Sequence, residues 1–307
     1  MQARNITVKI FIENKDVTVD LAPYLRGLTF EDNLSGEADT IDIELNDKAR
    51  LFVDDWFPDL AATLDVTLVK DGEELPLNSF EIDEVEASSP PSTFKIKAVS
   101  VSQNSALRQH DESKSWENVR LSEIAAQIAA DSGVELFFEA TDDPTITRAE
   151  QGEQSRLAFL EKICRDNFLA LKVADGKLVI FDESELDKQE PAAVITRDES
   201  AVIRFTARKT IQDVYKSCEV NYKHDRQDEL FQGRFDSEME HGKTLKINKK
   251  ETTVTIETVG AFEFLAGNVI ELKNFGKFDG NYLIEKARHQ LGNGYECSLE
   301  LRRCLDY

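Results

Sequence analysis

His289 is the residue in this sequence best suited to acid–base chemistry, because histidine titrates near neutral pH and Glu285 precedes it by four residues. No serine or cysteine of recognisable spacing accompanies it, and a catalytic assignment needs such a partner. His110, His224 and His241 are scattered among charged residues without the spacing of metal ligands. We therefore interpret His289 as structural and expect no catalytic residue, no metal and no cofactor.

Two pairs of adjacent acids, Asp54-Asp55 and Asp142-Asp143, are the candidates for glycosidase chemistry, which uses two carboxyl groups. Adjacent acids on a loop point apart and stay solvated, and nothing in the sequence fixes their separation or raises a pKa. These pairs favour a solvated surface over an active site.

Four glycines between predicted strands could be mistaken for a phosphate-binding loop. Neither a helix N-terminus nor a lysine-serine pair follows them, so turn geometry explains them better. These glycines are Gly276, Gly280, Gly292 and Gly294.

The charge balance argues against nucleic-acid and membrane-surface binding. The 307 residues include 37 basic and 59 acidic side chains, and this formal charge of −22 repels phosphate backbones and anionic lipids. No apolar run approaches the roughly 20 residues that span a bilayer, and the N-terminal segment is charged rather than signal-like. The cysteines lack metal-ligand spacing, and we expect them to be reduced and mostly buried: Cys164, Cys218, Cys297 and Cys304.

Length and periodicity predict an α+β, mainly β chain of two or three domains. From Ile6 to Ser102, apolar and polar residues alternate with period two, as in half-buried antiparallel strands. Turn residues at Asn14-Lys15-Asp16 and Asp71-Gly72 separate such strands. Residues 1–104 are therefore predicted to form a first small β-barrel or sandwich.

Helical spacing replaces the alternation from about Ser105 onward. One predicted helix ends at Gly133, and a second runs from Ser155, a good N-cap, to Asn167. A tight hairpin around Asp175-Gly176 follows. The pattern predicts a compact α+β insert.

A polar stretch over 182–193, closed by Pro191, suits an exposed connector. Alternating segments of strand length return after it, from VIRFTARK to YECSLELRR. The predicted organisation is thus an insert with its linker at 105–190, between the first β-domain and a second one at 191–307.

The segment from Leu265 to Arg303 is the most specific part of the sequence. It resembles the C-terminal barrel of the phage late control D and tail baseplate hub family, whose pattern is AG followed within five residues by V and L, then G-x-F-D-G-x-Y-x-I, then H, then GY before a closing strand. So many matches in order are hard to obtain by chance. The matching residues, to which the resemblance gives structural roles, are Gly267, Val269, Leu272, Gly276, Phe278, Asp279, Gly280, Tyr282, Ile284, His289, Gly294 and Tyr295.

The middle of the chain, from Trp116 to Phe181, resembles the inserted α+β module of the same family, so the resemblance covers about 116–307. One departure concerns the region between the strand ending near His224 and the strand near Val254. Family members carry a helix there, whereas here GKTLKINKKETTVTIET runs straight on. The local structure of residues 225–253 stays open.

The resemblance implies a homotrimer in which each chain supplies two tube-like antiparallel β-barrels, so that six barrels form a ring between a six-fold tail tube and a three-fold spike. It implies a structural hub in the tail baseplate of a phage or tailocin, similar to contractile injection systems and assembled in the host cytoplasm. The implied partners are the tail tube protein, the spike protein, the tape-measure protein and other baseplate proteins. DNA is expected to pass through the lumen without specific binding, and no membrane insertion is expected. Because the sequence ends soon after the closing strand, we expect the spike and any cell-wall hydrolase to be separate proteins.

A peptidoglycan-binding or cell-wall-degrading tail-tip protein is the competing hypothesis. Peptidoglycan-binding modules pack a comparable helix pair on a two-stranded sheet, and their strands bracket the helices, whereas the hairpin predicted here follows both helices. The sequence does not distinguish a phage from a tailocin, or a contractile from a non-contractile tail.

Overall fold

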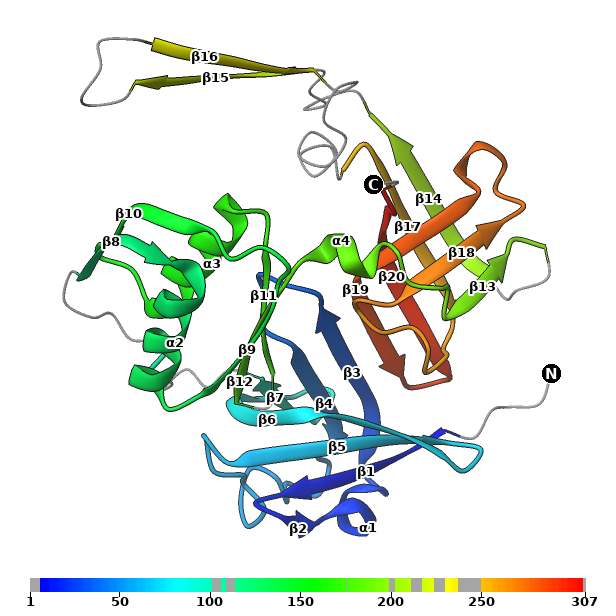
Figure 1. Cartoon of the computed structure of the whole chain (residues 1–307). Coiled ribbons are helices and arrows are strands. Elements are labelled where there is room, and N and C mark those ends of the chain that lie inside the picture. The colour runs from blue at the N-terminus through cyan, green and yellow to red at the C-terminus, as the bar shows by residue number, and fades with distance from the viewer. Residues whose placement is uncertain are drawn as a thin grey trace.

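The computed structural model describes residues 6–100, 106–108, 114–174, 176–198, 202–210, 217–223, 230–236 and 250–305. Within these residues the protein is mainly β, with few and short helices (Figure 1). The mainly β, α+β fold class predicted from the sequence is therefore confirmed.

The first β-block is formed by seven strands and one short helix. Alternate residues are buried, such as Ile41, Ile43 and Leu45, because a strand that faces a core on one side buries every second side chain. The β5–β6 turn uses Asp71 (φ 54°) and Gly72 (φ 90°), the positive-φ pair expected of a two-residue hairpin. The elements are β1 (Ile6–Ile12), β2 (Lys15–Asp16), α1 (Thr18–Leu21), β3 (Leu25–Asn33), β4 (Thr40–Asn46), β5 (Thr63–Lys70), β6 (Glu73–Ser88) and β7 (Thr93–Val99).

The insert contains the two predicted helices and more strands than predicted. Gly133 ends the first helix in the left-handed conformation (φ 69°), and Ser155 Oγ accepts the N–H of Ala158 at the start of the second, as expected. Three strands, β8 to β10, precede or separate the helices. The elements are β8 (Lys114–Arg120), α2 (Leu121–Ser132), β9 (Glu135–Glu139), β10 (Thr145–Gln151), α3 (Arg156–Asp166), β11 (Ala170–Ala174) and β12 (Lys177–Phe181).

The strand pairing of the insert changes one expectation drawn from the sequence. β8 pairs with β10, and β12 pairs with β11 and, in parallel, with β9. Strands therefore lie on both sides of each helix in the chain. Strand order no longer separates this insert from a peptidoglycan-binding module.

The connector after the insert is only partly exposed, whereas the sequence predicted an exposed segment. It contains α4 (Glu183–Leu186), and Asp182, Ser184 and Asp187 are all buried. Their polar groups have partners in the folded chain, which hydropathy alone does not reveal. The connector packs as part of the protein body.

The second β-block carries the strands predicted from VIRFTARK onward. β15 and β16 pair only with each other among the described strands and lie apart from the rest (Figure 1). Residues 225–229 and 237–249 lie outside the described residues, as do His110, His224 and His241. The elements are β13 (Ala193–Thr196), β14 (Val202–Lys209), β15 (Ser217–Lys223), β16 (Leu230–Asp236), β17 (Thr252–Val259), β18 (Val269–Lys273), the 3-10 turn η1 (Gly276–Phe278), β19 (Gly280–Leu291) and β20 (Tyr295–Arg303).

The two β-blocks share one sheet, because β3 of the first block pairs with β19 of the second. The order is β14-β17-β20-β19-β3-β4-β7-β6-β5-β1-β2, with β18 pairing to β19 and β13. One hydrophobic core runs through both blocks, and the insert has its own. Closure of either block into a barrel is not detected in the pairing of the described strands.

Five strands of the first β-block have equivalents in the second. The order β3-β4-β7-β6-β5 in the first matches β14-β17-β20-β19-β18 in the second, and the next strand differs in direction, since β1 is antiparallel to β5 and β13 is parallel to β18. Each block has a β-bulge at the same two places in this strand order. Aligning the bulges assigns an equivalent residue in one block to most residues of the other. The bulges fall between Leu25 and Gly27 as between Val202 and Arg204, and between Ile82 and Glu84 as between Ile284 and Lys286.

Candidate functional site

The motif residues of the second β-block hold the turn that joins β18 to β19. Asp279 accepts the backbone N–H of Phe275 at 2.6 Å, and the Tyr282 hydroxyl donates to the carbonyl of Phe278 at 2.8 Å. Gly280 has φ 133°, and a Cβ there would lie 2.9 Å from Arg303 Nη2. Each of these contacts is internal to the fold.

The other motif glycines also lie at bends of the chain. Gly267 (φ 93°) precedes β18 beside Leu34 and Leu186, and Gly276 (φ 71°) begins η1. Gly294 lies in the β19–β20 turn with open space around it. These positions explain the motif as turn and packing chemistry.

His289 is fully buried and both of its ring nitrogens are engaged. Nε2 donates to the carbonyl of Phe264 at 2.7 Å, and Nδ1 accepts from the Tyr295 hydroxyl at 2.7 Å. Burial lowers the pKa of His289, so the neutral ring is favoured. A buried neutral histidine that bridges β20 to the loop before β18 has no access to a substrate.

Cys297 is the neighbour of His289 that the sequence reasoning missed. Its Sγ lies 3.2 Å from His289 Nδ1, because the β19–β20 register places the two residues opposite each other. The hairpin turn over 292–294 was the available signal. Burial raises the pKa of the Cys297 thiol to about 11, so it is not a thiolate nucleophile at neutral pH.

Arg302 is a fully buried cation that ties the linker to β20. Its Nη1 lies 2.7 Å from Asp187, its Nη2 lies 3.1 Å from Glu183, and its Nε lies 3.7 Å from Glu285. Burial alone would lower the pKa of Arg302, but the carboxylates raise it. This cluster accounts for Glu285, which therefore has no role as a partner of His289.

A second buried ionic cluster joins three parts of the protein. Lys172 Nζ of the insert lies 2.6 Å from Asp32 and 3.2 Å from Asp39 of the first block. The other oxygen of Asp32 accepts the N–H of Ala266 in the second block at 2.8 Å. Burial raises the pKa of Asp39 to about 6, although Lys172 opposes that shift.

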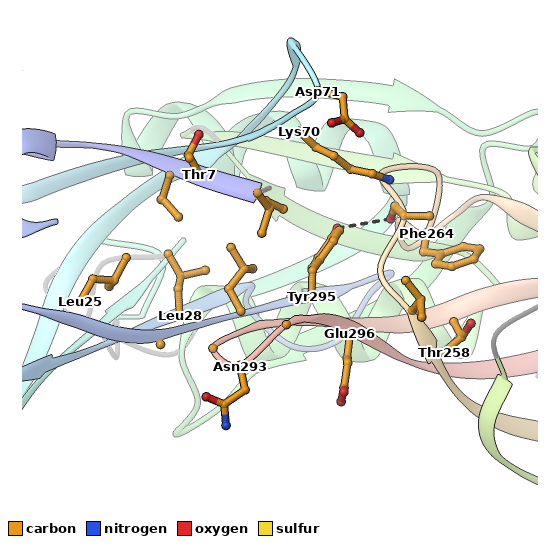
Figure 2. Close-up of a pocket in the computed structure, with 18 of the residues that line it drawn as sticks. Thr7, Leu25, Leu28, Lys70, Asp71, Thr258, Phe264, Asn293, Tyr295 and Glu296 are labelled. Carbon is orange, nitrogen blue, oxygen red and sulfur yellow. Dashed lines mark hydrogen bonds between the residues drawn. The ribbon is translucent and has the colours of Figure 1, made fainter. Parts of the chain in front are cut away.

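A groove of about 1520 Å³ lies between the two β-blocks (Figure 2). Tyr295 extends into it, and its hydroxyl oxygen, which bonds to His289, also lies 3.4 Å from the carbonyl oxygen of Ala261, whereas Asn293 and Glu296 point away (Figure 2). The walls come from β1, the start of β3, β13, the end of β17 with the loop after it, and the β19–β20 turn, and they combine apolar and polar side chains. Lys70 and Asp71 stand at the rim, and this arrangement suits packing rather than acid–base chemistry.

The acidic pairs do not form a dyad. Asp143 accepts the N–H and the hydroxyl of Ser122 at 3.0 and 2.6 Å and so caps α2, while Asp142 is exposed. Asp54 and Asp55 are both exposed on the β4–β5 loop. Within the described part of the chain, no group of three potential metal ligands is found and no helix is long and apolar enough to cross a membrane.

Comparison with known proteins identifies relatives by sequence, although no family model matches the chain. The chain is 28% identical over 196 residues to the probable baseplate hub protein of Escherichia phage P2, which covers 62% of this chain and 50% of the relative. It is 27% identical over 198 residues to that of Escherichia phage 186, covering 61% and 49%. The matches thus span about half the length of these curated relatives.

Solved structures match almost the whole chain. A tail protein from Neisseria meningitidis MC58 has a TM-score of 0.70 at 14% identity, over 97% of this chain and 96% of that one. The 43 kDa tail protein of prophage MuSo2 from Shewanella oneidensis has a TM-score of 0.66 at 12% identity, over 97% and 96%.

A component of the type VI secretion system of E. coli, described as similar to the phage T4 tail proteins gp27 and gp5, has a TM-score of 0.62 at 11% identity. It covers 99% of this chain and 77% of that protein. The chain is thus similar in sequence to two phage baseplate hub proteins, and its fold is that of the solved tail proteins.

Proposed function

We propose that this chain is a structural hub of a phage-type tail baseplate, in which three copies form a ring between the tail tube and the spike. The observation that carries this proposal is a likeness to tail proteins over almost the whole chain, together with two equivalent β-blocks inside it. Localisation in the tail baseplate follows from the same relatives.

The internal repeat suits a change of symmetry. Three chains with two equivalent blocks each supply six blocks, which match a six-fold tube, while the chains themselves match a three-fold spike. The two blocks are the tube-like domains in this proposal, with boundaries at 1–104 and 191–307 and the insert with its linker at 105–190.

A non-enzymatic role agrees with the chemistry of the described residues. His289 is buried and neutral, the Cys297 thiol is protonated, and Asp143 caps a helix. The motif residues Gly267, Gly276, Phe278, Asp279, Gly280, Tyr282, His289, Gly294 and Tyr295 act as structural residues in this proposal.

The acidic composition suits a channel that DNA passes. Each chain carries a formal charge of −22, and three copies treble it. Acidic walls repel the phosphate backbone, so DNA moves through without being held. The tube, spike, tape-measure and other baseplate proteins are the proposed partners.

The experiment that tests this proposal is deletion of the gene from the phage or prophage that carries it. We expect particles without complete tails in electron micrographs, and recovery of tails when the full-length chain is supplied from a plasmid. Light scattering of the purified chain, alone and with the spike protein, should show a trimer. Normal tails after deletion would contradict the hub assignment.

The cell-wall alternative is tested separately with the purified full-length chain. Retention on insoluble peptidoglycan, or clearing of peptidoglycan in a zymogram, would favour a wall-binding or wall-degrading protein. We expect neither, because Asp54 and Asp55 are both exposed on a loop and Asp143 caps a helix, which does not provide the spaced carboxyl pair that glycoside hydrolysis needs.

A further inference from the structure

Because the two β-blocks are equivalent, the contact between them within one chain can be repeated between two copies of the chain. Within the chain, β3 pairs antiparallel with the second half of β19, from Lys286↔Asn33 to Leu291↔Leu28. The charges match across this seam, because Arg288 and Lys286 of β19 both pair with Glu31 of β3 at 3.5 and 3.0 Å. The seam therefore combines a hydrogen-bonded ladder with opposite charges.

The strands at the equivalent positions leave their edges unpaired. β14 is the equivalent of β3, and it pairs only with β17 among the described strands. β6 is the equivalent of β19, and its second half, from Glu84 to Ser88, pairs with β7 alone among those strands. Among the described strands, these two edges therefore lack the neighbour that the equivalent edges have where β3 pairs with β19.

The charges on these two edges are complementary. Transferring the β3–β19 register through the aligned bulges places Glu86 of β6 opposite Arg208 of β14, and Val85 opposite Lys209. Glu84 and Glu86 are 55% and 52% exposed, and Lys209 is 61% exposed. Here the acid is on β6 and the base on β14, whereas in the β3–β19 contact the base, Arg288, is on β19 and the acid, Glu31, is on β3. Opposite charges on the two edges favour their pairing.

We infer that β14 of one copy pairs antiparallel with the second half of β6 of the next copy, which continues the sheet across the subunit boundary. This inference rests on the proposed hub function and names the partner as a second copy of this chain. The contact is heterologous, since two different edges meet, and its repetition gives a closed ring of three copies when each copy is rotated by a third of a turn, as the proposed trimer requires. Ile203, which is 54% exposed beside the β14 bulge, lies two residues before the stretch that pairs in this register, Phe205 to Thr210.

A competing explanation is that the charges on β14 only protect a free edge. Edge strands often carry Lys and Arg to prevent edge-to-edge association. Protection needs no partner and no register, whereas the inferred seam needs both. The experiment therefore has to measure register.

Cysteine cross-linking in the full-length chain measures it. Glu86→Cys protein mixed with Arg208→Cys protein should form a disulfide-linked dimer on mild oxidation, because residues opposite in a ladder lie about 4.5–5.5 Å apart. Each variant alone, and the unsubstituted chain, should form none. Glu86→Cys mixed with Arg204→Cys is the register control, since Arg204 lies four residues away along β14. No link at Arg208, or an equal link at Arg204, would overturn the inference.

Charge exchange provides a second readout in solution. Glu86→Arg or Arg208→Glu should weaken self-association about tenfold per seam, and the double variant should restore it. Arg148→Glu on the insert, where Arg148 is 67% exposed, is the matched control and should have no effect. Trimers insensitive to both single changes would overturn the seam and leave the hub proposal standing. Tails that assemble without the chain would overturn the hub proposal whatever the cross-linking result.

Discussion

The two β-blocks share one register but fill it with different chemistry. At three equivalent positions the first block has Phe80, Ala87 and Val99 where the second has Tyr282, His289 and Arg302. Each polar group of the second block bonds to a segment outside the strand ladder: the η1 turn, the loop before β18, and the linker. At these three positions the first block contributes only to the sheet, whereas the second block also anchors the chain segments that connect the domains.

The largest expected effect comes from removing the cation that anchors the linker. Arg302→Met leaves the buried Asp187 and the 13% exposed Glu183 without this cation, which costs about 3–5 kcal/mol of unfolding free energy. Urea denaturation measures the loss. Lys188→Met removes an exposed pair with Glu185 and should change stability by less than about 0.5 kcal/mol. Equal effects of the two variants would show that the linker anchor is unimportant.

Removing the cation that anchors the insert should have the second largest effect on stability. Lys172→Met removes the cation that pairs with both Asp32 and Asp39. Because Lys172 is 21% exposed, we expect a smaller loss of about 2–3 kcal/mol. Lys114→Met, which removes an exposed pair with Asp131 inside the insert, is the control. A loss no larger than that of the control would contradict a buried ionic anchor.

Asp39 and His289 should contribute opposite pH dependences. The pKa of Asp39 is raised from 3.8 to about 6 by burial, so the folded chain keeps a proton that the unfolded chain has lost. Its contribution therefore falls as pH rises from about 4 to 6, by up to about 1.4 kcal/mol per pH unit. The pKa of His289 is lowered from 6.5, so the unfolded chain binds the proton first and stability falls as pH drops below about 6.5.

Single variants separate these two contributions. Relative to the unsubstituted chain, Asp39→Asn should give a stability that rises more steeply from pH 4.5 to 6.5. His289→Gln should give one that rises less steeply or falls. Urea midpoints at several pH values measure both slopes. Unchanged slopes in both variants would show that neither group has a shifted pKa in the folded chain.

The strands and helices were predictable because their signals are local. Alternation marks β4 and β17, and the pairs Ser155 with Ala158 and Asp71 with Gly72 act within one turn. The buried residues of the linker were not predictable, because Arg302 lies 115 residues after Asp187 and a charged stretch is taken for a solvated one when its partner is unknown.

In the candidate site, too, local patterns were predictable from the sequence and long-range contacts were not. The motif from Gly267 to Tyr295 was found as a pattern, but its one functional-looking contact, Cys297 with His289, depends on a cross-strand register. The repeat of the two blocks was expected only through the family resemblance. The equivalence of individual residues in the two blocks is found only by aligning the bulges, because equivalent residues share a position in the sheet rather than a residue type.

The smallest predicted effect concerns one hydroxyl group that distinguishes the two β-blocks. Tyr282 and Phe80 occupy equivalent buried positions, and the Tyr282 hydroxyl has a carbonyl to which it donates. Tyr282→Phe should cost about 1 kcal/mol, the net value of one hydrogen bond. The reverse change, Phe80→Tyr, places a hydroxyl where the side chain is only 2% exposed, and should cost at least as much although it adds an atom that can bond. If Phe80→Tyr were neutral, the first block would have a free acceptor at this position, and the division between a sheet-building block and an anchoring block would not hold here.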